Sequence, residues 1–131
     1  MRHEIRTTRR EELVDVTGVV AGAIADSGVV SGAALVSSPH TTAGILVNEN
    51  ADPDVARDLL TGLEALAPRS KEWRHAEGNS DAHLKTALVG TSVLVPIEGG
   101  RLVLGTWQAV YFAEFDGPRS RHLNVTFMQG L

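Results

Sequence analysis

The chain has 131 residues, enough for one domain and too few for two, so residues 1–131 are taken as a single domain. Hydrophobic residues make up 43% and charged residues 21%, which excludes a disordered or fibrous chain. The lack of cysteine excludes disulfides and cysteine-bound zinc and fits a reducing compartment. A formal net charge of -4 argues against a nucleic-acid partner.

Two observations predict a soluble, cytoplasmic protein with no membrane partner. The longest apolar stretch, residues 16–25, is too short to cross a bilayer and lies between Asp15 and Asp26. Glu4 and Glu11 lie where a secretory leader would be purely basic.

The N-terminal residues predict a strand followed by a helix. Residues 2–7 are typical of a short edge strand. Thr8 and Glu11 form a capping-box pattern, and apolar residues at helical spacing follow them. Gly28 supplies the expected end of this first helix.

Two buried strand segments and a second helix come next. Residues 29–37 and 43–47 are small, β-branched and apolar, as buried strands are. Asp52 is a good N-cap, Pro53 suits the first helical position, and Pro68 ends the helix. The residues predicted to form its buried stripe are Val55, Leu59, Leu63 and Leu66.

Residues 80–89 predict a short third helix that Gly90 ends, with Leu84, Ala87 and Leu88 facing inward. The apolar pattern then changes to a period of two. The four strands that it predicts are residues 93–97, 102–104, 109–115 and 122–127.

Tight turns at residues 98–100 and 116–118 join the last strands and predict an antiparallel meander. The fold class is therefore α+β: a single compact domain with an antiparallel, β-sandwich-like sheet and two to three helices.

Three polar clusters interrupt the core pattern and mark candidate functional residues. They are residues 37–42 with 48–52, residues 75–85, and residues 105–108 followed by Arg119 and Arg121.

Short motifs in these clusters resemble the YjbQ family of small bacterial and archaeal proteins, also called secondary thiamine-phosphate synthases. The matching stretches are His40-Thr41-Thr42-Ala43, residues 48–55, Glu77-Gly78-Asn79, Ala82-His83-Leu84-Lys85, Gly90-Thr91-Ser92, residues 104–108 and residues 116–119. The resemblance implies a β-sandwich core, a homotrimer, and a weak ability to join a pyrimidine pyrophosphate to a thiazole phosphate, giving thiamine phosphate.

His40, His75 and His83 fall on these motifs and are candidate metal ligands. If they converge with Glu49 or Asp52 nearby, they would suit a zinc-type site with an open position. Their spacing does not require a metal, and the alternative is hydrogen bonding to backbone or substrate.

The start of the third helix is a candidate anion site. The N–H groups near Gly78 and Asn79 favour a phosphate, and Lys85 and Ser92 would supply further donors. The alternative is an ordinary capped helix with a solvated lysine.

Asn48 and Glu49 form an oxygen-rich run that suits magnesium shared with substrate phosphates. The alternative is a polar turn that caps the second helix through Asp52. Glu49 is the better candidate for chemistry, as a metal ligand or general base.

Four later residues are candidate ligand contacts. Trp107 would stack on a planar heterocycle while Gln108 contacts its polar edge, and the alternative, which the pattern favours, is a core tryptophan. Arg119 and Arg121 are two residues apart and so share one face of the last strand, where both would reach phosphate oxygens. Surface salt bridges are the alternative for the arginines.

The candidate residues suggest binding of a small phosphorylated molecule, and the YjbQ resemblance implies a homotrimer with thiamine-phosphate-synthase-type activity. His83, Glu49 and His40 are the candidate catalytic residues, and His83 or Glu49 would manage the proton. The divalent metal would be zinc or magnesium. The alternative is a non-catalytic, metal-binding trimer, and a purely structural interaction protein ranks third.

Overall fold

The computed structural model describes residues 1–69 and 72–131, which contain eight strands and three helices. In chain order these are β1 (Arg2–Arg6), β2 (Glu12–Asp15), α1 (Thr17–Ser27), β3 (Gly32–Ser37), β4 (Ala43–Glu49), α2 (Pro53–Leu66), α3 (Ser80–Val89), β5 (Ser92–Glu98), β6 (Arg101–Leu102), β7 (Gln108–Glu114) and β8 (Ser120–Gln129).

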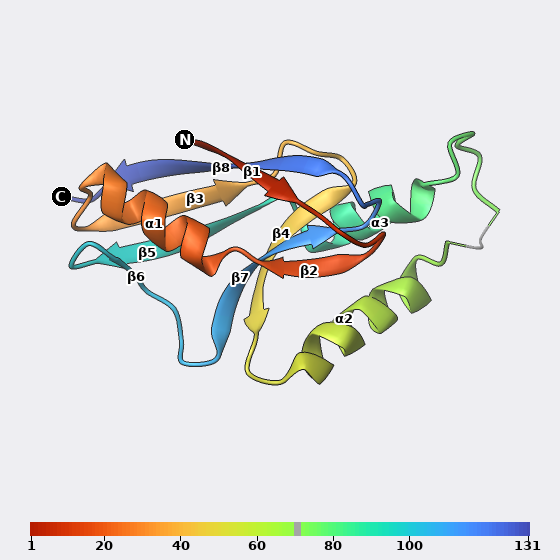
Figure 1. The fold of residues 1–131 in the computed structure, drawn as a ribbon, viewed down its shortest axis with the longest axis horizontal. Helices are drawn as coiled ribbons and strands as arrows, with labels where there is room; N and C mark the ends of the chain where they lie inside the picture. The colour runs from red at the N-terminus through yellow and green to blue at the C-terminus, as the bar shows by residue number, and fades with distance from the viewer. Residues whose placement is uncertain (70–71) are drawn as a thin grey trace.

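The strands form two antiparallel sheets that enclose the core (Figure 1). One sheet has the order β1-β8-β3-β5-β6 and the other β2-β7-β4. Val36 of β3 packs in one cluster with Ile45 of β4 and Phe112 of β7, and α1 adds Val20 and Ile24. This arrangement in one compact domain confirms the predicted α+β, sandwich-like class.

The first helix begins later than the capping-box pattern predicted. Residues Glu12–Asp15 form β2, which pairs with β7, because a strand here completes the smaller sheet. The Thr8 backbone N–H instead donates to Glu12 Oε1 at 2.5 Å. The helix end is confirmed, since Gly28 adopts a left-handed φ of 74°.

The predicted C-terminal meander is wrong, because β7 and β8 belong to different sheets. The turn at residues 116–118 carries the chain from the smaller sheet to the larger one, through a cis peptide between Gly117 and Pro118. Gly117 is required there because a Cβ would overlap the carbonyl oxygen of Arg9. The hairpin between β5 and β6 is confirmed.

The second helix starts as predicted, but its apolar stripe is only partly covered. Asp52 accepts a hydrogen bond from the Asp54 backbone N–H at 2.9 Å, and Pro53 is the first helical residue. Leu66 is 73% exposed, and no residue of α2 is fully buried. Figure 1 shows α2 beside the sheets, away from the core between them.

The third helix has the predicted bounds, but the prediction of its inward face is wrong. Leu84 and Leu88 are exposed, as is Ala87, whereas Asp81 and Lys85 are buried. The reason is a cluster of ion pairs beneath α3, which outweighs the apolar pattern. None of the described helices combines the length and hydropathy needed to cross a bilayer.

Candidate functional site

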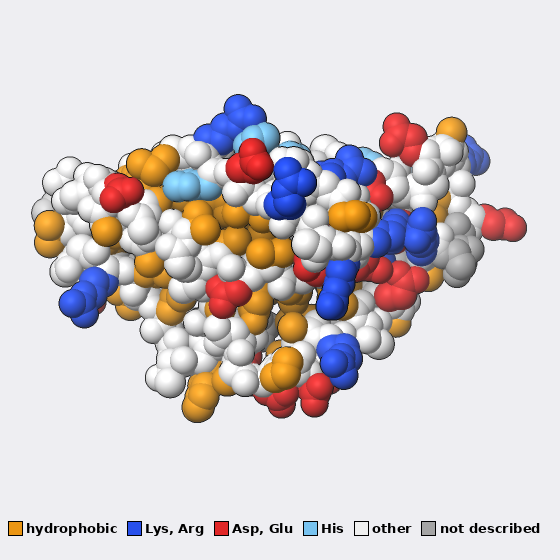
Figure 2. Space-filling view, viewed as in Figure 1, with side chains coloured by type: hydrophobic (Ala, Val, Ile, Leu, Met, Phe, Trp, Pro, Cys, Tyr) orange, Lys and Arg blue, Asp and Glu red, His pale blue; other side chains and the backbone are white. Residues whose placement is uncertain are grey.

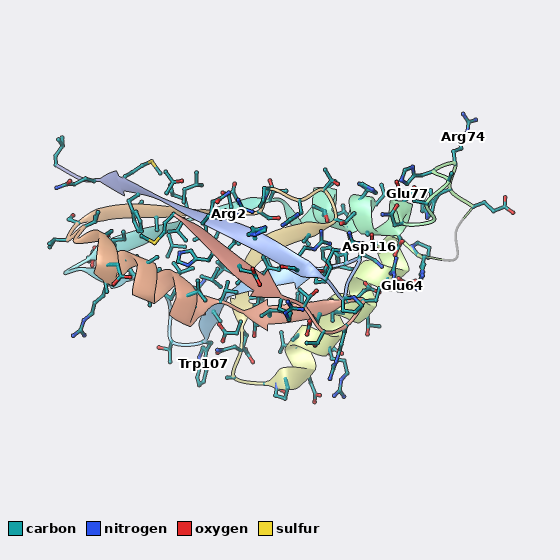
Figure 3. All side chains as sticks on the ribbon, turned by 45° about the horizontal axis from the view of Figure 1, so that its top comes forward. Arg2, Glu64, Arg74, Glu77, Trp107 and Asp116 are labelled. Atoms are coloured by element: carbon teal, nitrogen blue, oxygen red, sulfur yellow. The ribbon has the colours of Figure 1, made fainter. Side chains whose placement is uncertain are left out.

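A cavity of about 450 Å³ lies where the segment after β3, the segment before α3 and the turn between β7 and β8 meet. Its lining residues are Pro39, His40, Thr41, Thr42, His75, Glu77, Asn79, His83, Asp116, Arg119 and Arg121. The structure thus brings together all the predicted histidine ligands and both predicted arginines. Figure 3 shows Glu77 and Asp116 at the end of the molecule that carries α3.

Arg121 forms the floor of this cavity and is held by a buried carboxylate. Its Nε donates to Glu114 Oε1 at 2.8 Å, and its Nη2 contacts Glu114 Oε2 and donates to Thr42 Oγ1 at 2.9 Å. Thr7 Oγ1 also donates to Glu114, at 2.7 Å. Burial by itself raises the pKa of Glu114, but the Arg121 and Thr7 hydrogen bonds hold that pKa below its usual value.

Arg119 is held in a similar way at the rim. Its Nε donates to the backbone oxygen of Asp116 at 2.9 Å, and its Nη2 donates to Asp116 Oδ2 at 3.2 Å. Asn79 Nδ2 donates to the same carboxylate oxygen at 2.8 Å, so Asp116 links the rim arginine to the residue that precedes α3. The Asn79 Oδ1 atom is buried and has no hydrogen-bond partner among the described residues.

His40 lines the cavity, but its Nε2 is already used as a hydrogen-bond acceptor. Its Nε2 accepts the backbone N–H of His122 at 2.9 Å, so the neutral ring carries its proton on Nδ1. Burial lowers the pKa of His40, and the nearby Arg121 lowers it further. The neutral form therefore prevails at neutral pH, and Nε2 is not free to bind a metal.

His75 and His83 form a second imidazole group in the cavity. Their rings meet edge to face with centroids 5.5 Å apart, and His75 Nε2 lies 3.9 Å from Glu77 Oε2. Within residues 1–69 and 72–131, no three histidine, cysteine or acidic side chains are arranged to hold a metal ion. On the face shown in Figure 2, histidine and basic side chains lie along the edge that carries β1 and β8.

The family model for UPF0047 proteins of the YjbQ-like type matches residues 1–130. The chain belongs to this YjbQ-like family. The UPF0047 protein YugU of Bacillus subtilis is 51% identical over 126 residues, covering 95% of this chain and 96% of that protein. A UPF0047 protein of Methanocaldococcus jannaschii is also 51% identical, over 124 residues, covering 95% and 90%.

Solved structures of YjbQ-like proteins have the same fold. The crystal structure of an uncharacterized conserved protein of the YjbQ/UPF0047 family from Clostridium acetobutylicum is 48% identical and has a TM-score of 0.95, covering 98% of this chain and 99% of that one. A protein of unknown function from Sulfolobus solfataricus has the same TM-score at 34% identity, covering 99% and 96%.

Several predicted ligand residues of this YjbQ-like chain lie outside the cavity. They are Asn48, Glu49, Gly78, Lys85, Ser92, Trp107 and Gln108. Trp107 is 62% exposed, so it is not a core residue either. Gln108 Oε1 accepts the Gly105 backbone N–H at 2.8 Å, and the Asn48 side chain accepts the N–H of Glu49. These contacts stabilise local turns. Asn48 lies near the end of β4 and Gln108 at the start of β7, whereas the cavity lies beside the turn that follows β7.

Lys85 is a structural residue rather than an anion ligand. Its side chain is fully buried, and its Nζ donates to Glu64 at 2.6 Å, Glu11 at 3.0 Å and Asp81 at 3.1 Å. Arg10 binds both oxygens of Asp81 at 3.1 Å. Burial alone lowers the pKa of Lys85, but the three carboxylates raise it above the usual value, so the lysine stays charged.

Several residues of the cavity were not predicted from the sequence. Thr41, Thr42, Glu77 and Asp116 all lie inside motifs that carry the YjbQ resemblance, which was the available signal. Glu114, directly behind Arg121, is the charged residue within the apolar run of residues 109–115. A charged residue in a strand that is buried on both faces needs a partner, so this position was detectable too.

Proposed function

We propose that this protein is a homotrimer that binds a small phosphorylated molecule in the cavity and catalyses a thiamine-phosphate-synthase-type reaction. The observation that carries the proposal is the convergence of Arg119, Arg121 and three histidines on one cavity from segments far apart in the chain. Preoriented guanidinium groups are suited to phosphate oxygens. The YjbQ resemblance supplies the reaction type.

In this reaction, a thiazole nitrogen forms a bond to the pyrimidine methylene carbon, whose bond to the pyrophosphate oxygen breaks. The leaving group takes the electron pair, so its stabilisation is the main catalytic requirement. In this proposal Arg119 and Arg121 would bind that pyrophosphate. His83, whose ring meets that of His75 edge to face, would donate a proton to it.

The donor set of the cavity fits magnesium better than zinc. Magnesium is typically held by one or two carboxylates together with substrate phosphates, and the Glu77 carboxylate is 74% exposed at the cavity. Glu77 would hold the ion, which would neutralise charge on the pyrophosphate. A zinc site would need three protein ligands, and His40 has its Nε2 already occupied.

Titration calorimetry with pyrophosphate tests the binding. We expect Arg119→Ala to weaken pyrophosphate binding by about tenfold or more, because a charge-assisted hydrogen bond is lost. Arg57→Ala, which removes an exposed arginine on α2, should leave the affinity unchanged. A wild-type protein that does not bind pyrophosphate would contradict the proposed ligand class.

Steady-state turnover of the two thiamine precursors with magnesium tests the reaction itself. If the wild-type protein turns over the precursors no faster than the His83→Ala variant, the proposed enzymatic activity is contradicted. Stoichiometric zinc in protein purified without a histidine tag, with no turnover, would favour the metal-binding alternative instead.

Exposed apolar side chains support the trimer. Leu88 of α3 and Leu94 of β5 are each 60% exposed, and Trp107 lies at the tip of the segment between β6 and β7 (Figure 3). Contact with neighbouring copies would remove this apolar surface from water. We expect sedimentation velocity to give a trimer of 14.0 kDa chains, and Leu94→Asp to dissociate it. A monomeric wild-type protein at micromolar concentration would refute the trimer.

A further inference from the structure

Arg119 is the cavity arginine whose orientation depends most on its polar contacts. Its side chain is 51% exposed, whereas the Arg121 side chain is 4% exposed and is bound by Glu114 and Thr42. A long, exposed side chain loses rotamer freedom when it binds a ligand, and this loss weakens binding unless the side chain is already held in place. The affinity of the cavity for an anion therefore depends on what orients Arg119.

Asp116 holds one edge of the Arg119 guanidinium and leaves the other edge available. Nε of Arg119 donates to the Asp116 backbone oxygen at 2.9 Å, and one N–H of Nη2 donates to Asp116 Oδ2 at 3.2 Å. Nη1 and the second N–H of Nη2 have no partner among the described residues, and these two nitrogens can bind two oxygens of one anion. Asp116 thus orients Arg119 without occupying the donors that a ligand would use.

Asp116 is itself fixed from two sides. Its backbone N–H donates to Glu114 Oε2 at 3.0 Å. Its Oδ2, the oxygen that accepts Arg119, also accepts Nδ2 of Asn79 at 2.8 Å, and its side chain is only 18% exposed. A carboxylate beside an anion site repels the anion, so Asp116 would weaken anion binding if its charge were all that it contributed.

Resting on the proposed phosphate-binding function, we infer that Asp116 is a positioning residue that acts through Arg119. It orients the guanidinium group before the phosphate arrives, and this gain in affinity offsets the repulsion from its own negative charge. The role requires a hydrogen-bond acceptor at residue 116 and does not require the charge.

Uncharged replacements separate the hydrogen bonds of Asp116 from its charge. Asn79 and Arg119 both donate to Oδ2, so Asp116→Asn keeps an oxygen for both donors, whereas Asp116→Ala keeps none. Calorimetric titration of the full chain with pyrophosphate, in magnesium-free buffer at neutral pH, should show Asp116→Asn binding at least about threefold more tightly than Asp116→Ala. Asp116→Leu, which retains the side-chain volume without an acceptor, should bind as weakly as Asp116→Ala.

The same pair of replacements in an Arg119→Ala background tests whether the effect passes through Arg119. There Asp116→Asn and Asp116→Ala should bind pyrophosphate equally, because no guanidinium group remains to be oriented. Asp54→Ala is the matched control, since Asp54 also pairs with an arginine three residues later but lies outside the cavity. This control should leave the affinity for pyrophosphate unchanged.

Two results would overturn the positioning role while leaving the proposed function in place. One is equal affinity of the asparagine, alanine and leucine variants when Arg119 is present, and the other is a difference that persists when Arg119 is absent. A wild-type protein that does not bind pyrophosphate would contradict the proposed function, and the positioning role with it. Urea unfolding shows which variants are folded, and Asp116→Leu takes the place of Asp116→Ala in each comparison if the alanine variant is not.

Discussion

Replacing Lys85 with methionine is expected to lower the free energy of unfolding by about 3–5 kcal/mol, the usual cost of breaking a buried ion pair. Methionine fills a similar volume, so the loss comes from charge and not from a cavity. The Lys85 ammonium group is the shared partner of carboxylates from three segments: the residues before β2, α2 and α3. Without it, Glu11, Glu64 and Asp81 repel one another around a buried position.

Urea unfolding followed by tryptophan fluorescence, at fixed protein concentration, measures the Lys85→Met effect. The matched control is Arg57→Met, because Arg57 is 77% exposed and its pairing with Asp54 contributes little. We expect the control to change stability by no more than about 0.5 kcal/mol. Equal stability of Lys85→Met and the control would show that the buried cluster does not stabilise the fold.

The second large effect is expected for Glu114→Gln, at about 3 kcal/mol of lost stability. Oε1 of Glu114 accepts donors from Thr7 and Arg121, and Oε2 accepts donors from Arg121 and the Asp116 backbone. Both positions thus face donors exclusively, so the amide nitrogen of glutamine meets another donor in either orientation. Arg121 also loses its compensating charge in a buried setting.

Urea unfolding also measures the Glu114→Gln effect. The matched control is Glu98→Gln, which makes the same substitution at an exposed position at the end of β5. Thr7→Val removes the hydroxyl that donates to Glu114 and accepts the Arg119 backbone N–H, and should cost about 1–2 kcal/mol, which gives a graded series. A Glu114→Gln protein that unfolds at the same urea concentration as the Glu98→Gln control would mean that the Glu114–Arg121 pair contributes no net stability.

Local signals in the sequence predicted the elements well. Asp52 and Pro53 set the start of α2, and Gly28 and Gly90 end α1 and α3, because capping depends on a few neighbouring residues. The pairing of strands was harder. The turn at residues 116–118 resembles a hairpin turn, yet the chain changes sheets there, and this choice depends on distant strands that compete for the same edges.

The histidines and arginines of the site were predictable, whereas its acidic and threonine residues and its contacts were not. Imidazole and guanidinium groups on short motifs marked His40, His83 and Arg121, and the fold brings them to one cavity. The sequence could not show that Lys85 faces the core, because apolar spacing on α3 favoured the opposite side. Buried ion pairs join residues that are distant in the chain, and hydrophobic periodicity carries no information about them.

The pairing of Glu114 with Arg121 has a consequence for how the two sheets behave. Glu114 is the last residue of β7 in the smaller sheet, and Arg121 lies in β8 of the larger sheet. Their ion pair therefore connects the two sheets at the cavity floor. Occupancy of the cavity and the docking of the layers are therefore thermodynamically linked. An anion bound there as proposed would raise the melting temperature, and a change elsewhere that loosens the contact between the sheets would lower the affinity for that anion.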